Sequence, residues 1–289
     1  MSPILFLTDL DHNLFQSLRV DSGGLYPMTV NKTGKPHCYA TKAQLALMQL
    51  MMRNAFCVAV TARTPEQMMR VTGWSTNQEH NLALTDLGMT MLYRHKMGEW
   101  QIIEEWSEPY LAKARSLSLG LQVDFDQFQK TLNDHLCEYD GRLSYNLNFC
   151  HEDKDVPFYF LAQQTEKNTE CQIPVDVVRA ACKQFLDECQ GEYFYHESEG
   201  TFAMWPSYVS KFLAVERLMS AFDEGLKDER FELAREEKGC TDLVLASGDS
   251  MSDLPFMQMA HFWLAPGLSQ ISTMLMPDQV MPFTTNSYE

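Results

Sequence analysis

Two aspartates, Asp9 and Asp11, stand two positions apart near the start of the chain, in the stretch PILFLTDLDHNLF. They follow an apolar run that predicts a fully buried strand. Two carboxylates this close repel one another and raise each other's pKa unless a cation neutralises them. Mg²⁺ prefers oxygen ligands and is commonly held by one or two carboxylates together with a substrate phosphate. By itself the pair fits either a metal-assisted site or a metal-free turn after the strand.

Polar residues also follow two other expected strands. Thr61 comes directly after FCVAV, Asp249 comes two residues after LVLAS, and Asp253 lies one helical turn beyond Asp249. In an open α/β sheet the ligand crevice lies outside the carboxyl ends of the strands. We therefore expect these side chains to meet Asp9 and Asp11 at one rim of the sheet.

A substrate phosphate at this rim needs hydrogen-bond donors as well as a metal ion. The Thr61 hydroxyl is one donor, and the amides before the helix expected from Pro65 are others, because a helix N-terminus favours an anion. Lys211 begins an apolar-periodic helix in WPSYVSKFLAVERL and supplies a cation. Asp9 is then the residue expected to attack phosphorus and form an aspartyl-phosphate. Asp11 is expected to protonate the leaving oxygen and later to activate water.

The elements that carry these residues alternate between apolar strands and helices. Buried strands are expected at 4–8, 56–60, 243–247 and 261–267. Helices are expected after the capping box formed by Thr41 and Gln44, from Pro65, from Lys211 and after GDSMSD. A stretch rich in Gly, Pro, Asn and Ser, 16–40, is expected to form a long loop or hairpin. This alternation is typical of a parallel α/β sheet.

The middle of the chain has a different pattern. After TDLGM the sequence predicts strands near 89–95 and 100–106, a helix over EPYLAKARSLS, a helix near 125–137, strands near 145–151 and 158–164, a helix at 175–189, and strands near 192–196 and 201–205. Helix, strand and strand follow one another twice in this region. We therefore expect a separate α+β unit inserted into the parallel-sheet domain.

Four features, DLDHN, VTART, Lys211 and GDSMSD, resemble in order the motifs of the haloacid dehalogenase (HAD) superfamily of phosphatases. The resemblance implies that Asp9 is the nucleophile and Asp11 the general acid/base. It also implies that Thr61, Ala62 and Lys211 bind the phosphate. The implied Mg²⁺ ligands are Asp9, Asp11 through its backbone carbonyl, Asp249 and Asp253.

The resemblance extends to the architecture. It implies a Rossmann-like parallel-sheet HAD core formed by 1–86 and 205–289, with an inserted α+β cap at 87–204 that sets substrate specificity. The inserted part is similar to the class-two cap of the Cof-like and sucrose-phosphatase-like branch, and TDLGMTMLY favours the latter. The implied activity is that of a phosphoric monoester hydrolase acting on a small phosphorylated metabolite, most simply a sugar phosphate.

The chain departs from the family pattern at three places. His12 and Asn13 stand where the family usually has Gly-Thr, Ala62 stands for Gly, and Ser252 stands for Asn. His12 is either a proton relay or a residue facing solvent or the cap. Arg63 is a candidate for holding the cap or the substrate.

Composition excludes several classes of partner. The chain has 289 residues and a formal net charge of −16, which opposes binding to nucleic acid or to an anionic membrane surface. No apolar run is long enough to span a bilayer, and no signal peptide is recognisable. Eight cysteines lie at irregular spacings without a C-x-x-C pair, which is typical of reduced thiols in a cytoplasmic protein.

Two alternatives to a phosphatase remain at this point. GDSMSD also resembles the Gly-Asp-Ser block of serine esterases, which would make Ser250 a nucleophile and require a partner such as His261. A catalytically silent protein that keeps the fold is the other alternative. Neither a P-loop nor a dinucleotide-binding glycine motif is present in the sequence.

Overall fold

The structure is a computed structural model that describes residues 4–18, 23–96, 98–136, 145–151, 157–164, 175–189, 192–198 and 201–275. The chain forms two compact units. The first consists of Met1–Trp106 and Lys211–Glu289, and the second of Ser107–Ser210. Among the described residues, no helix is both long and apolar enough to cross a membrane.

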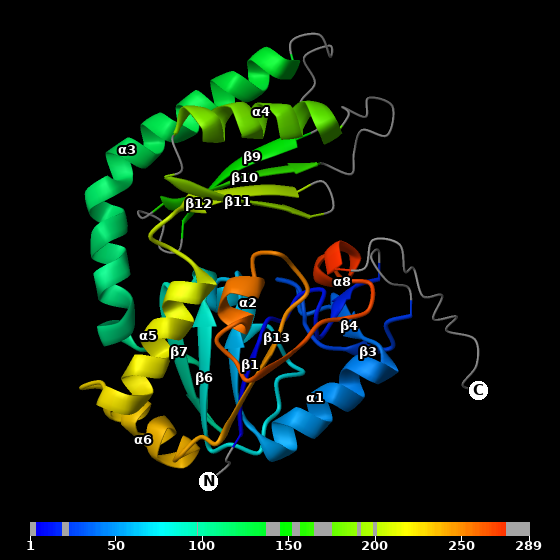
Figure 1. Cartoon of the computed structure of the whole chain (residues 1–289), viewed down its shortest axis with the longest axis vertical. Helices are drawn as coiled ribbons and strands as arrows, with labels where there is room; N and C mark the ends of the chain where they lie inside the picture. Colours follow the sequence, from blue (N-terminus) through cyan, green and yellow to red (C-terminus); the bar gives the residue numbers. More distant parts are fainter. Residues whose placement is uncertain are drawn as a thin grey trace. The chain divides into compact units, whose positions relative to one another are not determined.

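The first unit contains a mixed seven-stranded sheet (Figure 1). In sheet order its strands are β14 (Phe262–Leu264), β13 (Leu243–Ser247), β1 (Ile4–Thr8), β5 (Phe56–Val60), β6 (His80–Thr85), β7 (Thr90–His95) and β8 (Gln101–Ile102). Neighbours from β14 to β6 pair in parallel, while β7 and β8 are antiparallel additions. The expected α/β fold class is confirmed.

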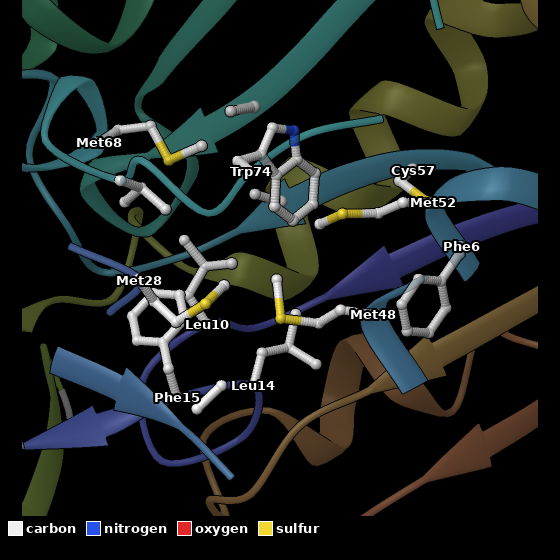
Figure 2. Packing of buried hydrophobic residues seen from close by; sticks show 14 of the residues in the cluster. Phe6, Leu10, Leu14, Phe15, Met28, Met48, Met52, Cys57, Met68 and Trp74 are labelled. Atoms are coloured by element: carbon white, nitrogen blue, oxygen red, sulfur yellow. The ribbon is translucent and has the colours of Figure 1, made fainter. Parts of the chain in front are cut away.

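Helices cover both faces of this sheet. They are α1 (Lys42–Asn54), α2 (Pro65–Met69), the 3-10 turn η1 (Asp86–Gly88), α5 (Lys211–Glu224), α6 (Glu229–Lys238), α7 (Leu254–Met257) and α8 (Gln270–Leu275). Successive side chains of a strand point to opposite faces. On β5, Cys57 accordingly joins the apolar cluster that includes Met48 and Met52 of α1 (Figure 2). Phe56 faces the other way and meets Phe222 of α5 edge to face, with ring centroids 6.2 Å apart.

The start of α1 is tied to the segment that follows β1. Thr41 and Gln44 form the expected capping box. The Gln44 side-chain amide also donates to the backbone carbonyl of Asn13 at 3.1 Å and to the Gln16 side chain at 2.7 Å. The expected loop or hairpin over 16–40 contains a small three-stranded sheet, ordered β2 (Gln16–Ser17), β4 (Cys38–Ala40) and β3 (Tyr26–Pro27).

The strand expected near 89–95 is β7, which belongs to the first unit. Of the strand expected near 100–106, only Gln101–Ile102 is a strand, because α3 begins at Glu104. We expected the inserted part to begin at residue 87, but the chain instead reverses at η1 and pairs β7 along the whole length of β6. Asp86 and Leu87 both adopt left-handed backbone conformations there. This tight turn makes a hairpin that extends the main sheet, so the second unit begins at Ser107.

The second unit pairs two helices with an antiparallel sheet. The sheet order is β11 (Tyr193–Ser198), β12 (Thr201–Pro206), β10 (Pro157–Gln164) and β9 (Tyr145–His151), and the helices are α3 (Glu104–Leu136), which starts in the first unit, and α4 (Val175–Glu188). The sequence predicts two helices where α3 is one continuous helix. Ala114, Leu121 and Phe128 are buried and seven residues apart, so the same apolar face continues through the expected break.

Candidate active site

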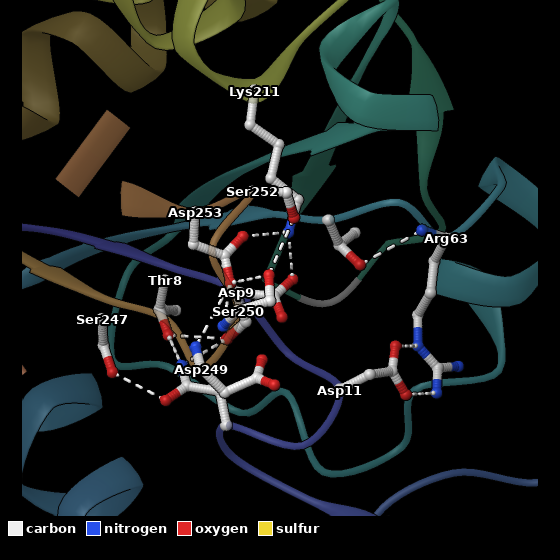
Figure 3. Close-up of polar contacts among 12 residues, drawn as sticks. Thr8, Asp9, Asp11, Arg63, Lys211, Ser247, Asp249, Ser250, Ser252 and Asp253 are labelled. Atoms are coloured by element: carbon white, nitrogen blue, oxygen red, sulfur yellow. Dashed lines mark hydrogen bonds and ion pairs between the residues drawn. The ribbon is translucent and has the colours of Figure 1, made fainter. Parts of the chain in front are cut away.

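In the loop after β1, leucine side chains are buried in the apolar cluster, whereas aspartate side chains contact polar groups. Asp9 continues the parallel pairing of β1, because its N–H donates to the Ser247 carbonyl at 2.8 Å. Leu10 and Leu14 are buried in the apolar cluster (Figure 2). The carboxylates of Asp9 and Asp11 instead contact polar partners, Lys211 and Arg63 (Figure 3).

His12 adopts a left-handed backbone conformation, with φ of 59°. That conformation carries no steric cost for glycine and some cost for any residue with a Cβ. The position therefore suits glycine, the residue that the resemblance leads us to expect here, and His12 occupies it with the same left-handed backbone.

Asn13 is buried and joins the ends of two neighbouring strands. Its side-chain N–H donates to the Asp9 carbonyl at 2.9 Å and to the Thr8 hydroxyl at 3.1 Å. Its side-chain oxygen accepts from the Ser247 hydroxyl at 2.8 Å. Because Ser247 ends β13, this side chain fixes the two strand ends on which the acidic residues depend.

Three carboxylates gather around one ammonium group. One oxygen from each of Asp9, Asp249 and Asp253 lies within 4.8 Å of the others. Lys211, the first residue of α5, places its Nζ 2.7 Å from Asp9 Oδ1 and 2.7 Å from Asp253 Oδ1 (Figure 3). Lys211 and Asp9 are almost fully buried, and Asp253 is fully buried. The structure thus brings together four of the residues that the sequence singles out.

The charges in this cluster do not balance. Burial raises the pKa of Asp9 well above its usual range, which the Lys211 ammonium partly offsets. Burial, reinforced by the charge of Asp253, raises the pKa of Asp249 to about 7. Burial alone would lower the pKa of Lys211, but the carboxylates of Asp253 and Asp9 outweigh it and raise that pKa. One ammonium therefore does not offset three ionised carboxylates, and the cluster favours either bound protons or an additional cation.

Asp253 is already saturated with hydrogen bonds. Its Oδ2 accepts from the Asp249 N–H at 3.2 Å, the Ser250 N–H at 3.1 Å and the Ser250 hydroxyl at 2.9 Å, while Lys211 occupies Oδ1. A Cβ added at Gly248 would lie only 2.5 Å from the Asp253 Cβ, so the loop requires glycine there. These contacts make Asp253 the residue that orients Lys211 and the loop. Asp9 and Asp249 remain the carboxylates best able to hold a cation.

The oxygen donors of this cluster fit a hard divalent cation such as Mg²⁺. Asp11 does not contribute its side chain to the cluster, since both of its oxygens accept hydrogen bonds from Arg63. Ser252 lies close by, with its hydroxyl 2.8 Å from that of Ser250.

Thr61 directly follows the neighbouring strand β5 at the same edge of the sheet. In the parallel register Thr8 pairs with both Ser247 and Ala59, so the three strands end at similar levels. Thr61 is fully buried, and its hydroxyl accepts from the Arg63 N–H at 3.1 Å. Ala62, in contrast, is exposed.

The η1 turn supports the loop that contains Thr61 and Arg63 through two backbone hydrogen bonds, a role that the sequence analysis did not predict. The Leu87 N–H donates to the Thr61 carbonyl at 3.1 Å, and the Asp86 N–H donates to the Arg63 carbonyl at 2.8 Å. The only sequence signal for this support is the short TDLG stretch ahead of an apolar strand.

Ser250 and His261 do not form an esterase pair among the described residues. The Ser250 hydroxyl donates to Asp253, and the His261 Nδ1 accepts from the Val244 N–H at 2.9 Å. Val244 lies near the start of β13, whereas Ser250 follows the end of that strand. His261 is therefore not positioned to act as the base for the Ser250 hydroxyl.

No protein-family profile and no curated protein sequence matches the chain. Solved structures do match. The chain is similar to the IMP-nucleotidase of Plasmodium falciparum, with a TM-score of 0.52 and 10% identity over 92% of this chain and 59% of that one. This likeness shows that the chain shares the fold of that protein.

Two further structures are similar at slightly lower TM-scores. The trehalose-6-phosphate phosphatase C-terminal domain of C. albicans gives 0.49, with 13% identity over 88% of this chain and 73% of that one. The sucrose-phosphatase of Synechocystis gives 0.45, with 13% identity over 96% of this chain and 97% of that one.

Proposed function

We propose that the chain is a phosphoric monoester hydrolase that cleaves a small phosphomonoester through an aspartyl-phosphate. The observation that carries the proposal is the buried Lys211 ammonium, 2.7 Å from both Asp9 and Asp253, beside a cluster of three carboxylates. An acidic site that keeps a buried cation is suited to a phosphate dianion, because catalysis of phosphoryl transfer consists mainly of positioning and charge neutralisation.

In the proposed reaction Asp9 attacks phosphorus, so that a bond forms between its carboxylate oxygen and phosphorus while the bond to the leaving oxygen breaks. Asp11 gives a proton to that leaving oxygen. Asp11 then takes a proton from water, which attacks phosphorus and releases Asp9. Lys211, the Thr61 hydroxyl and the Ala62 amide hold the phosphate oxygens throughout.

Mg²⁺ is the proposed cofactor. Asp9 and Asp249 would hold it, with the backbone carbonyl of Asp11 as a further ligand and Asp253 acting on the site through Lys211. When bound, the ion neutralises charge on the carboxylates and on the phosphate oxygens.

The proposed substrates are small phosphorylated metabolites, with sugar phosphates first. The second unit is proposed to act as the cap that selects among them. Because the chain shares its fold with a protein described as an IMP-nucleotidase, nucleoside monophosphates belong in the same panel.

The test is release of inorganic phosphate from a panel of sugar phosphates and nucleoside monophosphates, with Mg²⁺ and with EDTA. We expect turnover only with the metal ion, and none from Asp9→Asn. Asp242→Asn is the matched control, because Asp242 is an exposed residue just before β13. Near-normal turnover by Asp9→Asn would refute the mechanism. Inhibition by phosphonates without any need for Mg²⁺ would instead favour the Ser250 esterase.

A further inference from the structure

Asp11 and Arg63, which are far apart in the sequence, form a two-pronged ion pair (Figure 3). Arg63 Nε donates to Asp11 Oδ2 at 2.7 Å, and Arg63 Nη2 donates to Asp11 Oδ1 at 2.6 Å. Such paired bonds fix the orientation of a carboxylate as well as its position, since the guanidinium presents its donors in one plane.

The Phe15 ring and two backbone hydrogen bonds fix the position of Arg63 beside Asp11. The guanidinium lies over the Phe15 ring, 5.2 Å from its centroid, and the Arg63 backbone is anchored on both sides, to Thr61 and Asp86. The Arg63 side chain is 13% exposed and that of Asp11 38% exposed. Asp11 therefore faces outward, where a substrate arrives, while Arg63 stays shielded.

Phe15 contacts both members of this ion pair, Arg63 through its ring and Asp11 through its backbone. Its backbone carbonyl accepts from the His12 N–H at 2.9 Å, and it forms a β-bridge with Asp11. The ring that supports the guanidinium therefore belongs to the same turn that carries the carboxylate. Movement of Arg63 would be passed directly to Asp11.

We infer that Arg63 is a positioning residue: it orients the Asp11 carboxylate for proton transfer and does not bind the phosphate. This inference rests on the proposed function, in which Asp11 is the acid and base. Its basis is that Arg63 Nε and Nη2 both donate to Asp11, Nη2 also lying 3.8 Å from Cys38 Sγ. The Asp11 side chain is not one of the carboxylates clustered around Asp9.

Orientation of this kind has a measurable effect on rate. A misplacement of about 1 Å costs about 100-fold, and general acid or base catalysis contributes about 10²- to 10⁴-fold. We therefore expect Arg63→Gln to lower kcat by about 100-fold. Arg63→Lys keeps the charge but replaces the planar fork by a point charge, and we expect it to recover only about a tenth of the wild-type kcat.

The experiment measures kcat and KM for phenyl phosphate, and the inhibition constant of inorganic phosphate, in the full chain with Mg²⁺. The variants are Arg63→Gln, Arg63→Lys, Asp11→Asn and the double variant with Arg63→Gln and Asp11→Asn. Arg53→Gln is the matched control, because Arg53 is an exposed arginine at the end of α1. Circular dichroism melting checks that each variant is folded, and Arg63→Lys keeps the test valid should the glutamine variant fail to fold.

We expect Arg63→Gln to lower kcat while the inhibition constant of phosphate changes less than about twofold, because only proton transfer is disturbed. The double variant should be no slower than Asp11→Asn alone, since residues that act through one another are not additive. A weaker affinity for phosphate, or losses that multiply in the double variant, would overturn the inference. Failure of the proposed function is recognised separately, by wild-type protein that releases no phosphate or by an active Asp9→Asn variant.

Discussion

Replacing Lys211 by methionine tests the electrostatic design of the site most directly. The substitution keeps an unbranched side chain of similar size but removes the ammonium that contacts Asp9 and Asp253 at 2.7 Å each. Lys211 is 5% exposed and Asp253 is fully buried, so water cannot replace the lost partner well. Removing one member of a buried ion pair costs about 3–5 kcal/mol. We expect the variant to lose activity and about 3 kcal/mol of stability at neutral pH.

The loss should depend on metal and on pH in a defined way. Among the described residues, Lys211 is the cation that forms ion pairs with this cluster. Without it, Mg²⁺ should restore part of the stability, about 2.7 kcal/mol at a concentration 100 times the Kd. Burial already raises the pKa values of Asp9 and Asp249. Groups with raised pKa values bind protons more readily in the folded state, so acidification below neutral pH neutralises them and reduces the cost of the substitution.

The assay is urea unfolding followed by tryptophan fluorescence, in EDTA and in Mg²⁺, at neutral and mildly acidic pH. Four of the five tryptophans lie in the first unit, so the signal reports mainly on the unit that contains the site. Lys227→Met is the control, because Lys227 is exposed. A Lys211→Met variant as stable as wild type in EDTA at neutral pH would refute the reasoning, as would a loss that does not change with pH.

Three further predictions concern the same loops. Asn13→Ala removes the acceptor of the buried Ser247 hydroxyl and one of the two donors to the Asp9 carbonyl, which keeps the Thr8 hydroxyl. We expect urea unfolding to show a loss of about 2 kcal/mol; an unchanged midpoint would show that Asn13 does not join the strand ends. His12→Gly removes a side chain from a left-handed residue and should raise stability by about 0.5 kcal/mol, and full activity in that variant would exclude a proton relay through His12. Burial raises the pKa of Asp249 to about 7, so at lower pH Mg²⁺ must displace a proton from this carboxyl. Calorimetry should therefore show weaker Mg²⁺ binding at about pH 6 than at about pH 8. Equal affinity at the two pH values would contradict this prediction.

The local signals in the sequence were strong for the elements that carry the acidic residues. The strands at 4–8, 56–60 and 243–247 have the predicted bounds, because each is a short, wholly apolar run that ends in polar residues. The capping box at Thr41 and the start of α5 at Lys211 were equally visible. These features depend on residues within a few positions of one another.

Two elements could not be assigned in this way. The apolar strand β7 fits a buried strand of either unit, and only its pairing with β6 through the left-handed η1 turn places it on the main sheet. The two helices predicted before residue 138 are one, because the buried face at Leu121 and Phe128 continues across the stretch where the sequence suggested an end.

The sequence by itself singled out the charged residues Asp9, Lys211, Asp249 and Asp253. It also located the strands that precede Asp9 and Asp249 along the chain, because apolar runs and their polar ends are local properties. Only the tertiary structure decided how each group is used. Asp11 binds Arg63, Asn13 bonds to Ser247, and Asp253 is saturated by Lys211 and the neighbouring loop. Arg63, Ser247 and Lys211 are far along the chain from the residues they bind. A hydrogen bond forms only when both backbones hold its donor and acceptor within about 3 Å.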